Sequence, residues 1–232
     1  MRLIRLLFAG EMRAPVSVLA ASSAIGIGIV GARVMSTWNI VYAFLVWNLF
    51  LAWLPLVFAL LARETYRKDD QRRWRWIGLG IAWLLFFPNA PYILTDLVHL
   101  KTAYYTRFWT DLVVILLFAL TGLVLGFLSL YAMQSIVTDR FGKTAGWSFV
   151  ALAAGLAGVG VGIGRFFRLN SWDILRPGVF YERMDAWVGM SWGHLTLCLF
   201  MLLFSISLLV GYLMFYALTR LPQDFRIPEK HG

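Results

Sequence analysis

Six long apolar runs divide the chain, and they constrain its fold more than any other feature of the sequence. They cover about residues 15–35, 40–62, 76–98, 111–134, 146–164 and 192–218. A helix needs about 20 mainly apolar residues to cross a hydrocarbon core roughly 30 Å thick, and we count each run as meeting this need. We therefore predict an all-α polytopic membrane protein, a bundle of six transmembrane helices with a short interfacial outer segment.

The composition agrees with a membrane protein and excludes several other classes. Of the 232 residues, 60% are hydrophobic and 14% are charged, whereas soluble domains carry about 25% charged residues. The net charge of +9 would suggest nucleic acid in a soluble protein, but the basic residues cluster at the ends of apolar runs. We expect membrane lipids and no nucleic acid as partners. The single cysteine, Cys198, excludes an intramolecular disulfide and a cysteine-based metal site.

The linkers are short except 63–75 and 165–191, so we predict a single integral membrane domain over residues 1–232. The basic start resembles a signal peptide, but Glu11, Arg13 and Pro15 interrupt it before a run long enough to span. A retained first helix is the better interpretation. The sequence leaves open whether the chain forms a homo-oligomer or binds another membrane protein.

Lysine and arginine counts predict the orientation, because cytoplasmic loops are enriched in them. With both termini in the cytoplasm, that side holds 14 of the 21 basic residues and the outer side holds 7. The loop 63–75, with the cluster RKDDQRRWRW, is the strongest single contribution.

Polar residues of the spans gather on the predicted outer side. Pro88 lies about 18 Å from the cytoplasmic end of the third run, just past the midplane. Asp96 and His99 follow at the outer boundary, Asp111 opens the fourth run, and His194 begins the sixth. Ionisable groups in a span are costly and tend to face a bundle interior or a wet cavity. An outward-facing polar cluster is therefore expected.

Asp96 and His99 are the first candidates for chemistry, because a spacing of three residues places both on one helical face. A carboxylate can orient an imidazole there, and Asp111 and His194 would complete a catalytic cluster if the helix ends converge. A divalent metal held by Asp96, His99 and His194 is an alternative. Interfacial caps and hydrogen bonds between helix ends are a third interpretation of the same residues.

A second set of polar residues is predicted to bind substrate. Arg165 and Arg168, spaced by three at a helix end, suit a phosphate or carboxylate. The outer loop that follows is interpreted either as a lid over an outward-facing site or as an interfacial loop. The full predicted binding set is Asn48, Asn89, Tyr92, Arg165, Arg168, Asn170 and Asp173.

The segment FFPNAPYILTDLVHL, residues 86–100, should break the third helix. Continued helix through Pro88 and Pro91 would leave the carbonyls of Leu84 and Phe87 without donors, and unsatisfied groups at this depth are costly. Asn89 is the local candidate donor, with Asn48 and Tyr92 as others. The break should lie on the interior side of the bundle, and a plain proline kink is the alternative.

Small residues spaced by four predict helix–helix contacts. They occur in the first run (Ala20, Ala24, Gly28, Ala32), the fourth (Gly122, Gly126) and the fifth (Gly158 with Gly162, Gly160 with Gly164). The fifth also reads GVGVGIGR, but no strand precedes it, so helix packing is favoured over a phosphate loop.

Three segments together resemble a known family: WNLFLAWLPL (47–56), FFPNAPYILTDLVHL (86–100) and GRFFRLNSWDIL (164–175). The chain is similar to the uncharacterised bacterial membrane protein family catalogued as domain of unknown function 1361. The resemblance implies a multi-pass protein of the bacterial inner membrane and supplies no activity.

Three functions follow from these observations. The first is an enzyme acting at the outer side on a lipid or lipid-linked anionic substrate. The second is a structural or assembly protein without catalysis, and the third is a transporter that uses the broken third helix.

Overall fold

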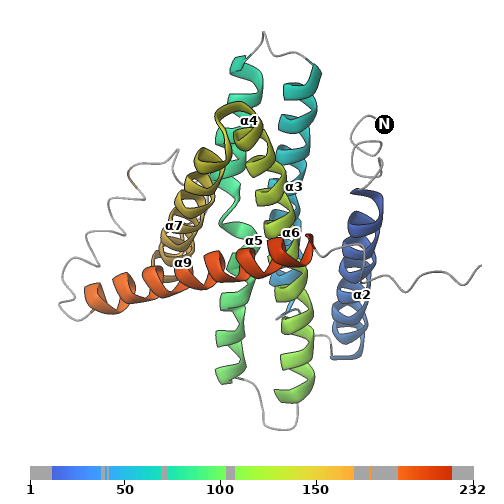
Figure 1. Cartoon of the computed structure of the whole chain (residues 1–232). Coiled ribbons are helices and arrows are strands. Elements are labelled where there is room, and N and C mark those ends of the chain that lie inside the picture. The colour runs from blue at the N-terminus through green and yellow to red at the C-terminus, as the bar shows by residue number, and fades with distance from the viewer. Residues whose placement is uncertain are drawn as a thin grey trace, which may run out of the picture.

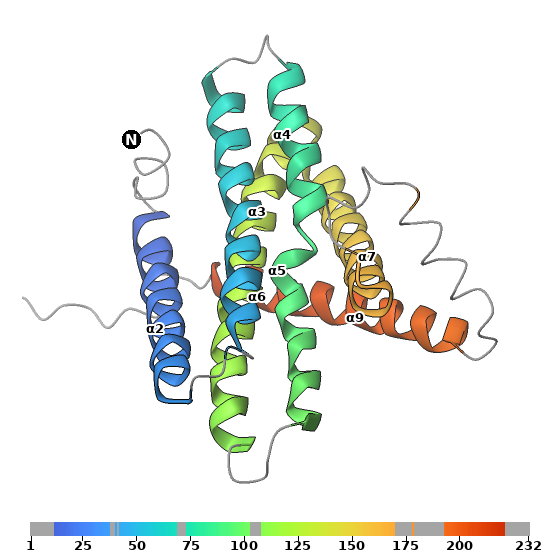
Figure 2. The same ribbon diagram turned by 180° about the vertical axis from the view of Figure 1, so that it is seen from behind.

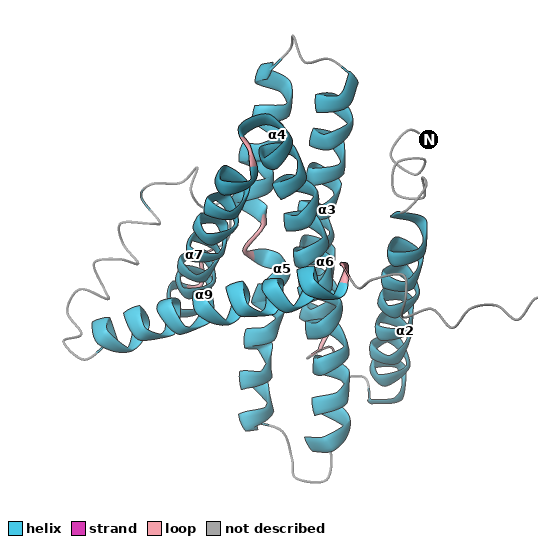
Figure 3. Cartoon of the chain, in the orientation of Figure 1, coloured by secondary structure: helices cyan, strands magenta, loops and turns pink. Residues whose placement is uncertain are grey.

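The computed structural model describes residues 12–37, 40, 42–68, 73–102, 108–169, 178 and 193–220, and all regular structure in these ranges is helical (Figure 3). The elements are α2 (Arg13–Thr37), α3 (Ala43–Lys68), α4 (Arg73–Phe86), α5 (Asn89–Tyr92), the 3₁₀ helix η2 (Ile93–Thr102), α6 (Phe108–Phe141), α7 (Lys143–Phe167) and α9 (Gly193–Leu218). Six helical segments are long and apolar enough to cross a membrane, one of them formed jointly by α4, α5 and η2. The predicted fold class is confirmed.

The helices form a bundle around α6. In Figures 1 and 2, α3, α6 and the α4–α5–η2 segment run side by side, and α2 flanks them. α7 is inclined to this group, and α9 runs crosswise to α3 and α6 while packing on α7. At 34 residues, α6 is about 51 Å long and extends beyond a hydrocarbon core of about 30 Å.

Close packing of large side chains and hydrogen bonds between buried polar side chains hold the bundle together. Trp83, Phe118 and Tyr212 are the largest side chains that are fully buried. The Trp83 indole donates to the Ser129 hydroxyl at 3.1 Å. The Tyr212 hydroxyl donates to the Gln134 side chain, which links α9 to α6. Both of these buried donors thus have an acceptor, as lipid surroundings require.

The predicted contact face of the first helix is wrong. Ala24, Gly28 and Ala32 are exposed, and no heavy atom lies within 4 Å of a methyl group built on Gly28. α2 instead packs through the face that carries Val16, Leu19, Ser23, Gly26 and Val30. Gly26 decides this face, because the Phe118 ring of α6 lies 2.9 Å from the position that a Cβ would take.

A cavity beside the broken helix

The third transmembrane segment is broken where its prolines predict, and its backbone groups are largely paired locally. α4 ends at Phe86, and a turn at Phe87 and Pro88 precedes α5. The Asn89 side-chain amide donates to the carbonyl of Phe86 at 3.0 Å. The Phe87 carbonyl, expected to lack a donor, accepts from the backbone N–H of Ala90 at 3.2 Å. A tighter turn therefore replaces the helical hydrogen bond that Pro91 removes.

Glycines of two neighbouring helices leave room for the broken segment inside the bundle. A Cβ on Gly122 of α6 would lie 2.7 Å from the carbonyl oxygen of Ala90. One on Gly160 of α7 would lie 2.7 Å from Cγ of Pro88. Gly126 and Gly164 also contact the segment, through Ala90 and Tyr92. The predicted packing role of these two glycine faces is confirmed, and the break lies in the interior.

The 3₁₀ helix η2 aligns the two candidate catalytic residues. It runs for ten residues, whereas such helices rarely exceed three or four. With about 3.0 residues per turn, residues i and i+3 eclipse one another, so Asp96 and His99 lie one above the other. The Thr95 hydroxyl supports this winding by donating to the Tyr92 carbonyl three residues earlier, at 2.7 Å.

Asp96 is buried and joins three elements of the bundle. Only 1% of its surface is exposed. Its Oδ2 accepts from the Asn48 side-chain amide of α3 at 2.8 Å. Its Oδ1 accepts from Nη1 of Arg165 of α7 at 3.4 Å. A buried carboxylate is costly unless it is paired and hydrogen-bonded, and these two partners meet that need.

His99 lies at the edge of the same site and faces open space. Its side chain is 45% exposed, and its Nε2 is 4.0 Å from Oδ1 of Asp96. This separation is beyond hydrogen-bond range, so the pair interacts as an ion pair only when the imidazole is protonated. The ring also packs against Phe44, with 4.8 Å between ring centroids.

A cavity of about 630 Å³ extends along this site, within the range of about 300–1,000 Å³ typical of small-molecule sites. One end is polar, with Asn48, Asp96, His99, Arg165 and Arg168, and the other is apolar. The other lining residues are Phe44, Leu51, Ile81, Leu84, Leu85, Pro88, Asn89, Tyr92, Leu156, Gly160, Ile163, Gly164 and Leu169. The cavity is therefore amphipathic.

Arg168 differs from Arg165 in its surroundings and backbone. It follows α7 in the left-handed conformation, with φ 55° and ψ 37°, and it is exposed. No other described non-glycine residue has a positive φ. Its guanidinium forms no hydrogen bond or ion pair with another residue that the structure describes. Arg165 thus serves as the counterion of Asp96, while Arg168 is a second arginine that lines the cavity.

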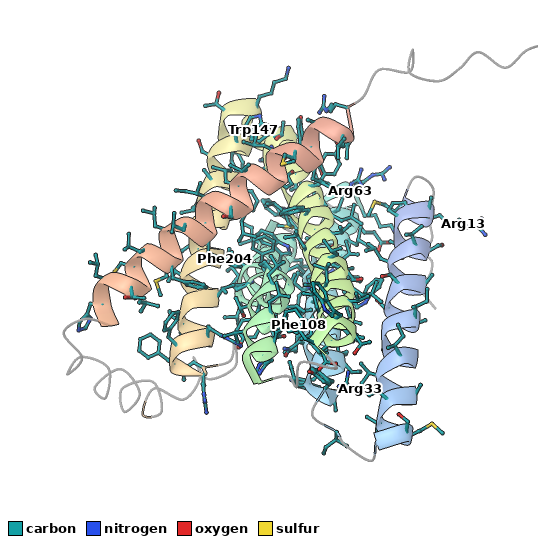
Figure 4. The ribbon with its side chains drawn as sticks, turned by 90° about the horizontal axis from the view of Figure 1, so that it is seen from below. Arg13, Arg33, Arg63, Phe108, Trp147 and Phe204 are labelled. Carbon is teal, nitrogen blue, oxygen red and sulfur yellow. The ribbon has the colours of Figure 1, made fainter. Side chains whose placement is uncertain are left out.

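Asp111 is not part of this cavity. It is buried near the start of α6, where it pairs with the Arg33 guanidinium and accepts from the Tyr42 hydroxyl at 2.6 Å. Burial, and next the hydrogen bond to Asp111, raise the pKa of Tyr42 to about 12. Figure 4 shows Arg33 on the side of α2 that faces the bundle. The expected convergence of Asp111 with Asp96 is replaced by this second ionic cluster, which fastens α2 to α6.

His194, in the first turn of α9, does not line the cavity either. Among the residues that the structure describes, no three His, Cys, Asp or Glu side chains gather closely enough to hold a metal ion. The ligand set of Asp96, His99 and His194 is therefore not assembled. Asn170 and Asp173 lie outside the described residues, whereas Asn48, Asn89, Tyr92, Arg165 and Arg168 all line the cavity.

Several residues of the site were missed by reasoning from sequence. Phe44, Leu84 and Leu156 line the cavity but look like ordinary residues of apolar spans. The Arg33–Asp111 pair carried a usable signal, because both residues lie at predicted outer helix ends and have opposite charges. Charge complementarity at one membrane boundary would have suggested their contact.

Comparison with known proteins places this site within a family. The model of DUF1361, described as a protein of unknown function, matches residues 47–216. The match includes all of the cavity lining except Phe44. Searches of curated proteins and of solved structures found no match. Since the family model covers well over half of the chain, the protein belongs to the DUF1361 family.

Proposed function

We propose that the protein binds a lipid or lipid-linked molecule with an anionic headgroup in the cavity beside the broken helix. The observation that carries this proposal is the division of the cavity into a cationic end and an apolar end. Arg168 and His99 would receive the headgroup, and Leu84, Leu156 and Ile163 would contact the hydrocarbon part. An amphiphile matches both ends at once.

The charges at the polar end support an anion in particular. Asp96 offsets the charge of Arg165 through their ion pair. The charge of Arg168 is not offset by a described neighbour. Guanidinium groups bind phosphate and carboxylate through paired hydrogen bonds.

Native mass spectrometry of the purified protein with added phosphatidylglycerol or phosphatidylcholine tests this binding. We expect preferential retention of the anionic lipid and about a tenfold or greater loss of affinity in Arg168→Gln, since a hydrogen bond to a charged group contributes about 1.5–3 kcal/mol. Arg67→Gln makes the same change at an exposed arginine outside the cavity and should bind like the wild type. Equal retention of both lipids, or equal binding by the two variants, would refute the proposal.

Catalysis on the bound headgroup is a second candidate function, favoured by the position of His99. Its imidazole is half exposed to the cavity and lies beside the buried Asp96. In hydrolysis of an ester, His99 would take a proton from the attacking water and return it to the alcohol oxygen as the ester bond breaks. Asp96 would act as a positioning residue.

Comparison of membrane lipids from cells that express the wild type or His99→Gln tests this activity. An enzyme predicts that one lipid accumulates in the variant and that its product decreases, while lipid binding by the purified variant persists. Unchanged lipids, together with a loss of thermal stability in Asp96→Asn, would instead support the structural alternative, in which Asp96 only joins α3, η2 and α7.

The proposed location is the bacterial inner membrane with both termini in the cytoplasm and the polar end of the cavity outside. Basic residues support this orientation: the last turns of α3 and α6 carry Arg67, Lys68 and Arg140, and α7 begins at Lys143. These helix ends lie together at one end of the bundle, uppermost in Figure 1. Reporters that are active only in the periplasm can be fused to the two termini and should be inactive there. Activity of either fusion would contradict this orientation.

A further inference from the structure

We infer that the ligand is a lipid that stays within the bilayer and enters the cavity sideways, with a hydrocarbon chain lying along α4 and α7. This inference rests on the proposed binding function and specifies the class of ligand. A soluble anion and a membrane lipid could both use Arg168. The shape and exposure of the apolar end distinguish them.

The cavity runs along the helices rather than across them. Figure 2 shows α5 and η2 between α3 and α7, and residues of all these elements line the space. Along α7 the lining extends from Leu156 to Arg168, which corresponds to about 18 Å at 1.5 Å per residue. The long direction of the cavity therefore follows the direction in which a lipid chain lies in a membrane.

The apolar end of the cavity opens sideways, on the surface of the bundle that faces away from its core. Ile81 of α4 and Leu156 of α7 both line the cavity, yet they are 65% and 42% exposed. Both belong to segments that are long and apolar enough to span, and both lie several residues inside those segments. At such a depth an exposed surface meets hydrocarbon rather than water.

The polar and apolar ends of the cavity thus follow one another along the helices in the same order as the headgroup and hydrocarbon chain of a lipid. Arg168 and His99 stand at the ends of their helical segments, at headgroup level, while Leu156 stands about 18 Å deeper, near the middle of its segment. A lipid of that leaflet can bring its headgroup to Arg168 while its chain occupies the apolar end. No passage of the chain through water is needed.

Photo-crosslinking in native membranes tests this route. The photoreactive residue p-benzoylphenylalanine replaces Leu156, and the control position is Ile25 of α2, which is 58% exposed and does not line the cavity. Lipid adducts are then identified by mass spectrometry. We expect the adducts at Leu156 to be enriched at least severalfold in one anionic lipid over the bulk membrane, and those at Ile25 to match the bulk.

Adding Arg168→Gln should reduce the enrichment at Leu156 to the level at Ile25. If the Leu156 adducts match the bulk while the purified protein still binds anionic lipid through Arg168, the sideways route is wrong and the proposed function stands. If binding through Arg168 is absent as well, both proposals fail. A melting temperature close to that of the wild type shows that the labelled protein is folded.

Discussion

Replacing Gly122 by alanine should destabilise the protein, because α6 passes the broken helix too closely to admit a methyl group. The new Cβ would lie 2.7 Å from the carbonyl oxygen of Ala90 and 2.9 Å from Cδ1 of Ile93. The Ile93 side chain can rotate, but the carbonyl belongs to the backbone. Relief of the clash therefore requires α5 and α6 to separate.

The size of the effect follows from this separation. Close carbon–oxygen contacts occur at about 3.3 Å or more, so the two helices must move apart by roughly 0.6 Å. Overpacking of this kind costs about 1–3 kcal/mol, and alanine recovers at most about 1 kcal/mol through its higher helix propensity. We expect a net loss of about 1–2 kcal/mol, or a melting temperature lower by about 2–8 °C.

Thermal unfolding in detergent, followed by tryptophan fluorescence, measures this change. Gly28→Ala is the matched control, since it makes the same substitution in a helix where no heavy atom lies within 4 Å of the new methyl group. It should melt at or slightly above the wild-type temperature. If Gly122→Ala and Gly28→Ala have the same melting temperature, the close approach of α6 to Ala90 does not constrain the fold. The account of the break is then wrong.

Two further substitutions test the charged residues. Arg168→Gly should raise stability by up to about 1 kcal/mol, because an L-residue in the left-handed region is strained, while anionic-lipid binding decreases. A variant that loses stability and keeps binding would contradict the assigned role of Arg168. Asp111→Asn should lower stability by about 2–3 kcal/mol, since it removes the negative charge that Asp111 places beside the partly buried Arg33. The double variant Arg33→Met with Asp111→Leu should recover much of this loss in thermal unfolding, and no recovery would show that Asp111 acts through other contacts.

The break in the third span was predictable because proline acts locally. Pro88 and Pro91 cannot donate backbone hydrogen bonds wherever the chain places them, so residues 86–92 had to depart from a regular helix. The donor to the Phe86 carbonyl could also be predicted from local sequence, because Asn89 lies only three residues further along the chain. The 3₁₀ winding of the ten residues after the break had no comparable signal, because the same sequence can follow either helix type.

The site was only half predictable, for a related reason. Asp96 and His99 lie on one element, and their spacing alone placed them on one face. Asp111 and His194 lie on other helices, and membership of one membrane boundary does not determine which neighbours meet there. In the structure, Asp111 forms an ion pair with Arg33 and accepts a hydrogen bond from Tyr42. The two arginines of α7 also divided their roles through tertiary contacts, since only Arg165 pairs with Asp96.

The sequence by itself determined that the protein is a helical membrane protein, where its spans lie and which one is broken. These properties depend on the length of apolar runs and on the backbone chemistry of proline, both of which are local. The tertiary structure alone decided which glycine faces are used, which carboxylate faces the cavity and that the cavity joins a cationic end to an apolar one. Those properties depend on which helices are neighbours, and in lipid that choice rests on close packing and paired polar groups rather than on hydrophobicity.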